Sequence, residues 1–371
     1  MKYGVMIYES TSNIGDDIQS YAAKRFLPRI DTVIDREKMD GFCLRNKVDE
    51  PVTVIMNGWY MHRKFNWPPS PLINPLYLSM HITEYDFLDI GYRFLDGLGG
   101  DYLRQFEPIG ARDESTLALL KEKGIEAYLS GCLTLTLALP DQGERGDEVI
   151  LTDVNKADAA ALIKQFPNEN WQKVSHTIDP EATRQKSLDE RFEAVEALLK
   201  RYQRAKCVVT ERLHCALPCL ALGTPVLLLW ENDNLDRMSS FLPLLHNMRI
   251  GETDACSTVF NIASPPENST AYLKIRSELE DRCRAFIRDA ESNYRPSICF
   301  PSEDVIAWQK NLMRDSELTY FTKISRIQES IRKKDKELTD IKKSVAFRLG
   351  TDIAKPWRLV RDRVKKYRRQ F

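Results

Sequence analysis

Residues 210–229, TERLHCALPCLALGTPVLLL, decide how this chain folds. The apolar residues just before them, 207–209, predict a short buried strand, and the apolar run at 226–230 predicts a second one. Between these strands lies a helical stretch that ends at Gly223 and Pro225, since both residue types stop helices. A strand, a helix and another strand in this order are typical of a parallel α/β sheet.

Three polar residues stand where the first of these strands ends: Glu211, Arg212 and His214. Ligands of an open α/β sheet bind beyond the carboxyl ends of the strands. An arginine offers two parallel donors to a carboxylate or phosphate, and a histidine moves protons near neutral pH. The sequence therefore predicts a ligand site here, although a salt-bridged arginine and a capping histidine would give the same pattern.

Strands and helices alternate in both halves of the chain. We expect strands at 3–10, 52–56, 109–112, 125–129, 149–152, 171–178, 207–210 and 226–230, and helices at 17–27, 116–123, 157–165, 188–202, 213–222, 271–290 and 302–312. A polar stretch at 141–147 separates the halves as a linker. The pattern predicts two doubly wound parallel-sheet domains, 1–140 and 148–320, with a ligand cleft between them.

The composition of the chain excludes several classes of protein. Its 371 residues suit two domains, the opening segment is too short and polar for a secretory signal, and no apolar run is long enough to span a membrane. Eight cysteines occur without a CxxC pair, so we expect no structural zinc and no other metal site. These features predict a cytoplasmic protein with reduced cysteines.

Charge is distributed unevenly along the chain, although the net charge is zero. Residues 322–371 contain 17 Lys and Arg but 6 Asp and Glu, whereas the other 321 residues contain 37 and 48. Apolar residues recur every three or four positions between 324 and 345, which predicts a long amphipathic helix or a short coiled coil. Residues 321–371 are therefore expected to form a basic helical tail on an acidic body.

A second apolar stripe follows Gly350 and lies among many basic residues. Its members are Ile353, Trp357, Val360, Val364, Tyr367 and Phe371. Aromatic residues on one helix face and basic residues on the other suit an anionic membrane surface, so we expect peripheral attachment to the inner face of a membrane. The alternative is a helix that packs on the acidic part of its own chain, or of a twin subunit in a homo-oligomer. We expect no nucleic-acid partner.

Further candidate residues lie elsewhere at predicted strand ends. Asn13 and Asp16 stand at a helix N-terminus, which attracts anions, or they form an ordinary capped helix start. Arg112 binds a ligand, or it pairs with the acidic residues that follow it. His176 is a ligand-binding candidate or a structural histidine with satisfied hydrogen bonds. The aromatic loop at 59–67 either stacks on sugar rings or forms part of the core.

Three stretches taken together resemble one family of enzymes. They are NIGDDIQSYA at 13–22, GARDESTLALLKEKGIEAYLSGC at 110–132 and VVTERLHCALPCLALGTPVLLL at 208–229. They look like the polysaccharide pyruvyl transferase family, and the resemblance covers about residues 1–250. It implies a two-domain, GT-B-like fold. It also implies transfer of an enolpyruvyl-derived group from phosphoenolpyruvate to two sugar hydroxyls, which forms a pyruvate ketal and releases phosphate.

The resemblance implies partners and residue roles as well. The acceptor would be a sugar or lipid-linked oligosaccharide precursor of a surface, capsular or exopolysaccharide. The family's Arg-x-His element falls on Arg212 and His214, and its Gly-x-Arg element falls on residues 110–112. The expected catalytic residues are His214, Arg212 and Glu211, the expected phosphoenolpyruvate-binding residues are Arg112, Arg212 and His176, and the expected acceptor-binding residues are Asn13, Asp16, Gln19, Asn57 and Trp59. The scheme needs no metal and no cofactor, because phosphoenolpyruvate is a co-substrate and cationic side chains offset its charge.

Two other functions fit the sequence. A GT-B glycosyltransferase that uses a nucleotide sugar would bind its nucleotide in the second domain. A catalytically silent scaffold of a polysaccharide-assembly complex would bind no ligand in the cleft, and it would tolerate changes at Arg212 and His214.

Overall fold

The computed structural model describes residues 1–42, 49–60, 67–82, 93–140, 143–232, 235–292, 294 and 300–343. The chain divides into two units, Met1–Leu312 and Met313–Phe371, and the helix α12 (Ser302–Lys343) runs across the boundary between them. Residues 344–371 of the predicted basic tail and residues 61–66 of the aromatic loop lie outside the described residues.

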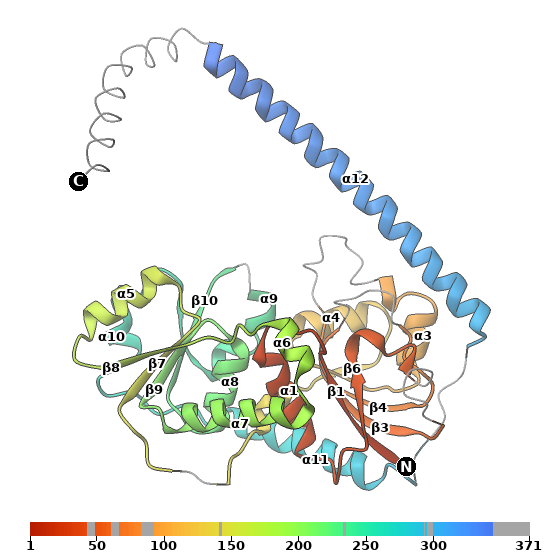
Figure 1. The fold of residues 1–371 in the computed structure, drawn as a ribbon, viewed down its shortest axis with the longest axis horizontal. Helices are drawn as coiled ribbons and strands as arrows, with labels where there is room; N and C mark the ends of the chain where they lie inside the picture. The colour runs from red at the N-terminus through yellow and green to blue at the C-terminus, as the bar shows by residue number, and fades with distance from the viewer. Residues whose placement is uncertain are drawn as a thin grey trace. The chain divides into compact units, whose positions relative to one another are not determined.

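The first unit contains two parallel sheets, one from each half of the chain (Figure 1). The strands of the first sheet are β1 (Lys2–Ile7), β2 (Thr32–Asp35), β3 (Val52–Trp59), β4 (Ile73–His81), β5 (Ile109–Ala111) and β6 (Ala127–Leu129). Their order is β2-β1-β3-β4-β5-β6, and every described pairing is parallel.

The strands of the second sheet are β7 (Glu148–Thr152), β8 (Asn170–Val174), β9 (Cys207–Thr210), β10 (Val226–Trp230) and β11 (His246–Arg249). Their order is β11-β10-β9-β7-β8, again parallel throughout. Two parallel sheets with helical crossovers confirm the predicted α/β fold class. They also align the carboxyl ends of the strands within each sheet, so strand-end residues gather at one edge.

The helices of the first unit are α1 (Ile14–Lys24), α3 (Leu98–Arg104), α4 (Glu114–Glu122), α5 (Lys156–Gln165), α6 (Pro180–Gln185), α7 (Leu188–Arg204), α8 (Leu213–Ala221), α9 (Leu235–Met238), α10 (Cys256–Val259) and α11 (Tyr272–Arg288). Short 3-10 turns lie at η1 (Arg36–Lys38), η2 (Arg93–Leu95), η3 (Leu133–Thr136), η5 (Leu242–Leu244) and η6 (Thr253–Ala255). Of the described helices, none is both long and apolar enough to cross a bilayer.

One apolar core joins the two sheets. Helices α1, α7 and α8 lie between them in Figure 1, and their buried residues belong to a single cluster with η3. Ile18 of α1 and Leu217 of α8 are fully buried in it. Beside this core, Arg191 of α7 donates from Nε to Asp17 Oδ2 of α1 over 3.2 Å, with a second contact from Nη2 to Oδ1. The halves are therefore held together by packing and by a buried ion pair.

The structure corrects several predicted boundaries. Helix α1 begins at Ile14 rather than at 17, because the Asn13 side chain accepts a hydrogen bond from Gly15 N and caps the helix. Strand β8 ends at Val174 rather than at 178, because Asp153 takes over the hydrogen bonds of the next two residues. The separate helices expected at 302–312 and after 321 are one helix, α12.

Two strands of the first sheet were not expected from the sequence. They are β2 and β4, and in β4 Pro75 pairs with Val54 in the middle of the sheet. Proline is unusual there because it cannot donate a ladder hydrogen bond. The aromatic residues beside this segment are core, since Tyr60 and Trp67 are 1% and 0% exposed. For these two rings the structure bears out the alternative in which the loop forms part of the core.

Candidate active site

A cavity of about 730 Å³ opens at the carboxyl ends of strands from both sheets. Its volume falls within the roughly 300–1,000 Å³ common for small-molecule sites, and its position is the one where open parallel sheets bind ligands. The described residues that line it are Tyr8, Glu9, Ser10, Thr11, Ser12, Asn13, Asp16, Gln19, Asp35, Arg36, Glu37, Lys38, Trp59, Arg112, His176, Arg184, Glu211, Arg212, Leu213, His214, Arg237 and Met238.

Arg212 is held at the carboxyl end of β9 by a turn and by an ion pair. Thr210 Oγ1 donates to Thr152 O over 3.0 Å and accepts a hydrogen bond from Arg212 N over 2.9 Å. The Arg212 Nε donates to Asp153 Oδ2 over 2.8 Å, yet 45% of the arginine side chain stays exposed. The guanidinium is therefore oriented by one carboxylate and still accessible to a ligand.

Asp153 ties Arg212 to the loop after β8. Its φ of 50° lies in the left-handed region, which residues other than glycine enter rarely. Its carboxylate accepts hydrogen bonds from Ser175 Oγ at 2.7 Å and from His176 N at 3.1 Å. Burial opposes the charged form, but the hydrogen bonds from Ser175, His176 and Arg212 outweigh it and lower the pKa of Asp153.

Glu211 uses its carboxylate to hold the start of α5. Its Oε1 accepts hydrogen bonds from Asn155 N at 2.7 Å and from Asn155 Nδ2 at 2.9 Å. Asn155 in turn caps α5 by accepting from Ala157 N and Asp158 N. Glu211 lines the cavity, but these contacts favour a role in positioning the strand end over a role in proton transfer.

His214 lies in the first turn of α8 and faces the N-terminus of α1. A Cβ on Gly15 would lie 3.1 Å from His214 Cβ, so the glycine of the NIGDD motif permits this close approach. The His214 Nε2 is buried and has no hydrogen-bond partner among the described residues. Burial, followed by the nearby cations Arg112 and Arg237, lowers the pKa of His214 well below its ordinary value. The imidazole is therefore neutral at neutral pH.

His176 combines a structural contact with an open one. Its ring Nε2 lies 2.8 Å from Tyr202 Oη, which also lies 3.1 Å from Thr152 Oγ1. Its Nδ1 is buried and has no partner within the described part of the chain. Its carbonyl accepts a hydrogen bond from Ile14 N at 2.9 Å, which joins the loop after β8 to the start of α1. His176 thus stands at the contact between the two halves.

Arg112 follows β5 and is fully buried. Its Nε donates to Asp113 Oδ2 over 3.2 Å, which confirms the predicted local salt bridge. Its Nη1 and Nη2 have no hydrogen-bond partner among the described residues, although Arg112 lines the cavity. A buried guanidinium with two unsatisfied nitrogens is costly unless an anion completes it. These two nitrogens are suited to donate hydrogen bonds to the oxygens of an anion.

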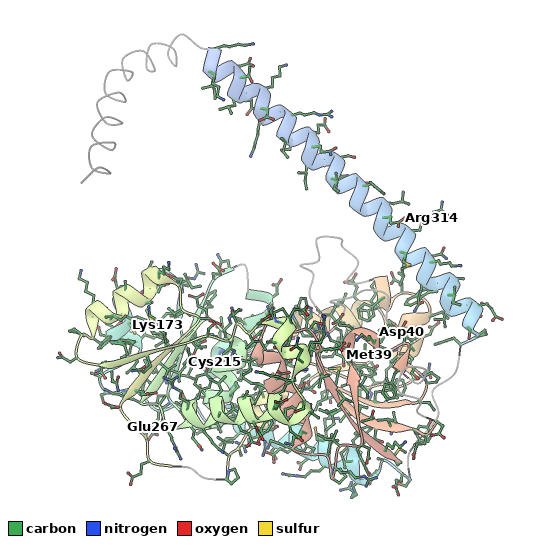
Figure 2. All side chains as sticks on the ribbon, in the orientation of Figure 1. Met39, Asp40, Lys173, Cys215, Glu267 and Arg314 are labelled. Carbon is green, nitrogen blue, oxygen red and sulfur yellow. The ribbon has the colours of Figure 1, made fainter. Side chains whose placement is uncertain are left out.

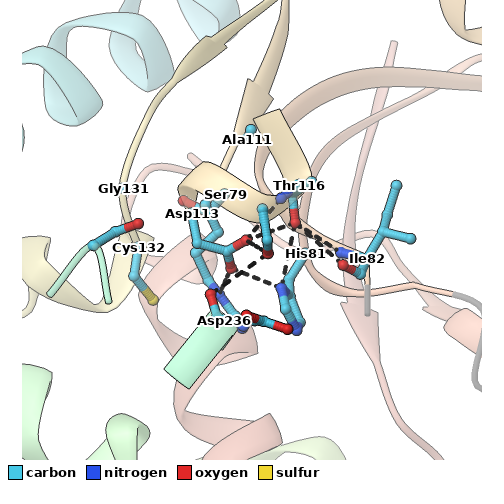
Figure 3. A network of polar contacts seen from close by, with 12 residues as sticks. Ser79, His81, Ile82, Ala111, Asp113, Thr116, Gly131, Cys132 and Asp236 are labelled. Atoms are coloured by element: carbon cyan, nitrogen blue, oxygen red, sulfur yellow. Dashed lines mark hydrogen bonds and ion pairs between the residues drawn. The ribbon is translucent and has the colours of Figure 1, made fainter. Parts of the chain in front are cut away.

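Asp113, which accepts the hydrogen bond from Arg112, belongs to a network of polar contacts (Figure 3). His81 Nδ1 lies 2.7 Å from Asp113 Oδ2, and Thr116 Oγ1 donates to Asp113 Oδ1 over 2.7 Å. Burial and the Arg112 cation lower the pKa of His81 to about 4, outweighing Asp113. Burial would raise the pKa of Asp113, but His81, Arg112 and Thr116 hold it well below its usual range. At neutral pH a neutral histidine therefore donates to a charged carboxylate.

Arg237 of α9 also lines the cavity, near Arg112 and Arg212. Burial and the neighbouring Arg112 cation lower the pKa of Arg237 to about 10. The segment just after α9 contacts the start of α4, since Ser240 Oγ accepts a hydrogen bond from Glu114 N at 2.9 Å. Ser115 Oγ also reaches Asp236 O over 3.5 Å (Figure 3). The inner end of the cavity is therefore strongly cationic.

The expected acceptor-binding residues divide into two groups. Asn13, Asp16, Gln19 and Trp59 line the cavity. Asn57 does not line it; it is 2% exposed, and its Nδ2 donates to Gln19 O over 3.0 Å. The structure thus places Asn57 beneath Gln19 rather than at the surface of the cavity.

The outer wall of the cavity contains charges that are already paired. Arg36 donates from Nη1 to Trp59 O over 2.9 Å and from Nε to Glu37 Oε1 over 2.5 Å. Lys38 contacts Glu9 and lies 3.0 Å from Asp35 Oδ2. In contrast to the inner end, this wall offers carboxylate oxygens and an aromatic residue without unbalanced positive charge. Across the described residues, no three His, Cys, Asp or Glu side chains are grouped so as to hold a metal ion.

The family of this chain follows from a sequence comparison. The model of the polysaccharide pyruvyl transferase family matches residues 13–233, more than half of the chain. The chain belongs to the polysaccharide pyruvyl transferase family. That match covers the strand ends of both sheets, including Arg112, Arg212 and His214. No curated protein sequence matches the chain.

Solved structures with similar folds are distant in sequence. An uncharacterized protein from Klebsiella pneumoniae is 14% identical with a TM-score of 0.39, over 67% of this chain and 92% of that one. The S. aureus MnaA–UDP complex is 10% identical with a TM-score of 0.43, over 81% and 100%. The UDP-GlcNAc 2-epimerase from Methanocaldococcus jannaschii is 11% identical with a TM-score of 0.42, over 79% and 100%.

Three residues of this pyruvyl transferase family member were missed in the sequence: His81, Asp153 and Arg237. Asp153 had a usable signal, because it follows a predicted strand directly. His81 had none, because β4 was not among the predicted strands. Arg237 lies in a four-residue helix, too short to show a periodic pattern.

Proposed function

We propose that this chain transfers a pyruvyl group from phosphoenolpyruvate to two hydroxyls of one sugar unit, forming a cyclic ketal and releasing phosphate. Membership of the polysaccharide pyruvyl transferase family supports the reaction class. The observation that carries the proposal is the buried Arg112, with two guanidinium nitrogens that lack partners among the described residues and with Arg212, Arg237 and His214 around the same cavity. Phosphoenolpyruvate, a small molecule with a carboxylate and a phosphate, suits such a site.

The cationic inner end is the proposed donor site. Arg112 offers two donors from a buried, fixed guanidinium, which suits two oxygens of one anionic group. Arg212 and Arg237 come from the other sheet and would bind the second anionic group. Cations around the leaving phosphate would stabilise the charge that it carries as the carbon–oxygen bond breaks.

The proposed reaction must account for the two protons that the sugar hydroxyls lose. Two hydroxyl oxygens bond to the central carbon, the carbon–oxygen bond to phosphate breaks, and the methylene carbon becomes a methyl group. The two hydroxyls lose one proton each. One of these protons replaces the proton that the new methyl group takes up, and the other leaves with phosphate. His214 is the proposed proton carrier. Its low pKa leaves the imidazole unprotonated in the free protein, where it can accept a proton. A bound anion would raise that pKa and favour the protonated form.

The outer wall is the proposed acceptor site. Trp59 offers an aromatic surface, and Glu37 and Asp35 offer carboxylate oxygens that accept hydrogen bonds from sugar hydroxyls. Gln19 and Asp16 of α1 also line the cavity and would orient the reacting hydroxyls. Asn57, which holds Gln19 from beneath, would act by positioning it.

Phosphate release tests the proposal directly. Purified full-length protein is incubated with phosphoenolpyruvate and a panel of free and lipid-linked oligosaccharides, and phosphate and the pyruvylated product are measured. We expect both in a one-to-one ratio and only with an acceptor. A nucleotide sugar consumed in place of phosphoenolpyruvate would replace the proposal with a glycosyltransferase. The absence of any binding of phosphoenolpyruvate by calorimetry would support a silent scaffold.

His214→Asn tests the proton carrier. We expect kcat to fall by ~10²–10⁴, the range for loss of a general acid or base, while binding of phosphoenolpyruvate weakens far less. His246→Asn, a histidine outside the cavity lining, is the matched control. Equal and modest losses in turnover and binding would make His214 a binding residue.

The basic tail, 344–371, is proposed to attach the protein to an anionic membrane surface, as its aromatic and basic pattern predicts. Such attachment would bring the cavity to lipid-linked acceptors. The test is sedimentation with anionic vesicles at low salt, with a chain truncated after Lys343 as control. Vesicle binding that survives the truncation would contradict the proposal.

A further inference from the structure

The helix α12 presents two faces with different surroundings. Near its start, Gln309 Nε2 donates to Trp67 O over 3.0 Å, and Leu312 is buried. Trp308 packs so close to Gly99 that a Cβ there would lie 3.0 Å from the indole. On the other face Ile306 is 50% exposed. One face of the first turns thus packs within the first unit, and Ile306 on the other face is exposed to water.

Farther along α12 an exposed apolar seam begins. Its members alternate at spacings of three and four residues: Ile324, Ile327, Ile331, Lys334, Leu338 and Ile341. In a heptad they occupy a and d positions, and Lys334 is the single polar member. Ile331 and Ile341 are 53% and 55% exposed. Figure 2 shows the side chains of α12, from Arg314 onward, standing out around the helix. Such a row of aliphatic side chains marks an interaction surface.

The period of the seam identifies the kind of partner. A straight α-helix drifts by ~20° per heptad from a 3.5-residue repeat, so a seam of this period stays in contact only with a helix that coils around it. The positions on both sides of the seam are polar: Gln328, Ser330, Asp335, Glu337 and Lys342. This narrow stripe differs from the wider apolar face of a helix packed on a globular body.

The charges of the helix argue for a protein partner and against lipid. Residues 313–343 contain nine Lys and Arg and six Asp and Glu. A helix lying on an anionic membrane would instead carry a mainly basic polar face. Glu337 and Lys342 stand at g and e positions five residues apart, which is the spacing that pairs opposite charges between two identical parallel helices. The helix is thus complementary to itself.

We propose that the 324–341 seam of α12 forms a parallel, in-register coiled coil with another copy of this chain. Glu337 of each copy faces Lys342 of the other, and Lys334 sets the register at some cost in stability. Isoleucine at both a and d positions favours three strands over two, so the measured mass gives the number of copies. The assembly would hold several basic tails together, which strengthens any surface binding that they share.

The first experiment measures the mass of the full-length protein by light scattering at several concentrations. The monomer has a mass of 42.9 kDa, and we expect at least twice that value. The double variant Ile331→Lys with Leu338→Lys should return the mass to the monomer. The matched control, Ser325→Lys with Thr339→Lys, adds the same charge at exposed positions outside the seam and should leave the assembly intact. Circular dichroism checks that all variants fold.

The second experiment measures orientation. In a parallel, in-register coil, the thiols of Leu338→Cys from two copies meet and form a disulfide under mild oxidation, whereas those of Thr339→Cys do not. The six cysteines that the structure describes are buried and add little background. A monomeric wild-type protein, an unchanged mass in the seam variant, or equal cross-linking of the two cysteine variants would each overturn the proposal. So would a monomer whose vesicle binding is lost in the seam variant.

Discussion

The ends of β5 and β9 each supply an arginine to the cavity, and they hold it differently. Arg112 follows β5, is fully buried, and keeps two nitrogens without partners among the described residues. Arg212 follows β9 and is 45% exposed. In both cases an aspartate accepts a hydrogen bond from Nε: Asp113 in the first sheet and Asp153 in the second.

The difference teaches what each arginine is built for. Water satisfies the exposed Arg212 guanidinium when no ligand is bound, so this residue costs the fold little. Arg112 cannot be satisfied in that way, and a buried charge with open donors costs several kcal/mol. A fold tolerates such a free-energy cost where the binding of a ligand offsets it. We therefore expect Arg112 to be the principal anchor of the anion and Arg212 to be an adjustable second contact.

The largest effect is expected from Arg112→Lys. A lysine cannot reproduce two fixed donors, and each charged hydrogen bond contributes about 1.5–3 kcal/mol. We expect kcat/KM for phosphoenolpyruvate to fall by ~10²–10⁴ in the phosphate-release assay. Arg201→Lys, at an exposed ion pair with Glu148 outside the cavity lining, is the control. A loss below threefold in a folded Arg112→Lys protein would remove the contrast between the strand ends.

The second effect is on the free energy of unfolding. His81, which contacts Asp113, and Asp153 should change it in different pH ranges. The folded protein keeps the pKa of His81 at about 4, whereas an unfolded histidine has a pKa near 6.5. Below pH ~6.5 the unfolded state therefore binds the proton first, and the free energy of unfolding falls until pH ~4, by about 3 kcal/mol. The lowered pKa of Asp153 acts in the carboxyl range, so its contribution is lost only below pH ~4.

Urea unfolding of the wild type and of His81→Asn between pH 4 and pH 7 measures this effect. We expect the wild type to lose more stability on acidification than the variant does. The same comparison with Asp153→Asn should show curves that run parallel above pH ~4.5. Parallel curves for His81→Asn as well would mean that His81 is not kept neutral by its burial beside Arg112.

Much of the fold could be predicted because a buried parallel strand has a strong sequence pattern. The runs at 149–152, 207–210 and 226–230 are continuous and apolar, as strands covered on both faces are. Strand β4 escaped prediction because Pro75 suggested a loop. Strand β2 escaped because four residues give too little pattern.

The candidate site was predictable only where chemistry and chain position coincide. Arg112 directly follows β5, and Arg212 and His214 lie within four residues of the end of β9, so the topology of a parallel sheet brings them together. His81 contacts Asp113 from the end of β4, 32 residues earlier in the sequence, and Arg237 arrives through a short helix. These contacts depend on long-range packing that no local pattern encodes. The sequence also could not reveal that the Glu211 carboxylate accepts a hydrogen bond from Asn155 N.

The third effect concerns the exposed strand end. Arg212→Lys keeps the charge near Asp153 but loses the paired donors, so we expect kcat/KM to fall by ~10–30-fold, equivalent to about 1.5–2 kcal/mol. The free energy of unfolding should change by less than about 1 kcal/mol, because the ion pair is exposed. A loss equal to that of Arg112→Lys would show that the two arginines hold the anion equally despite their different burial.

The smallest effect is expected from Thr210→Val. The position is fully buried, and the change keeps the shape while removing the hydroxyl that joins Thr152 O to Arg212 N. We expect the free energy of unfolding to fall by about 1 kcal/mol and kcat/KM to fall by roughly two- to fivefold, because Arg212 loses a backbone constraint rather than a ligand contact. Thr224→Val is the matched control, since its buried hydroxyl donates to Tyr202 O and does not line the cavity. It should lose similar stability and keep full activity. If both variants keep full activity, the exposed strand end does not depend on its turn to hold Arg212, and Asp153 alone sets the position of the guanidinium.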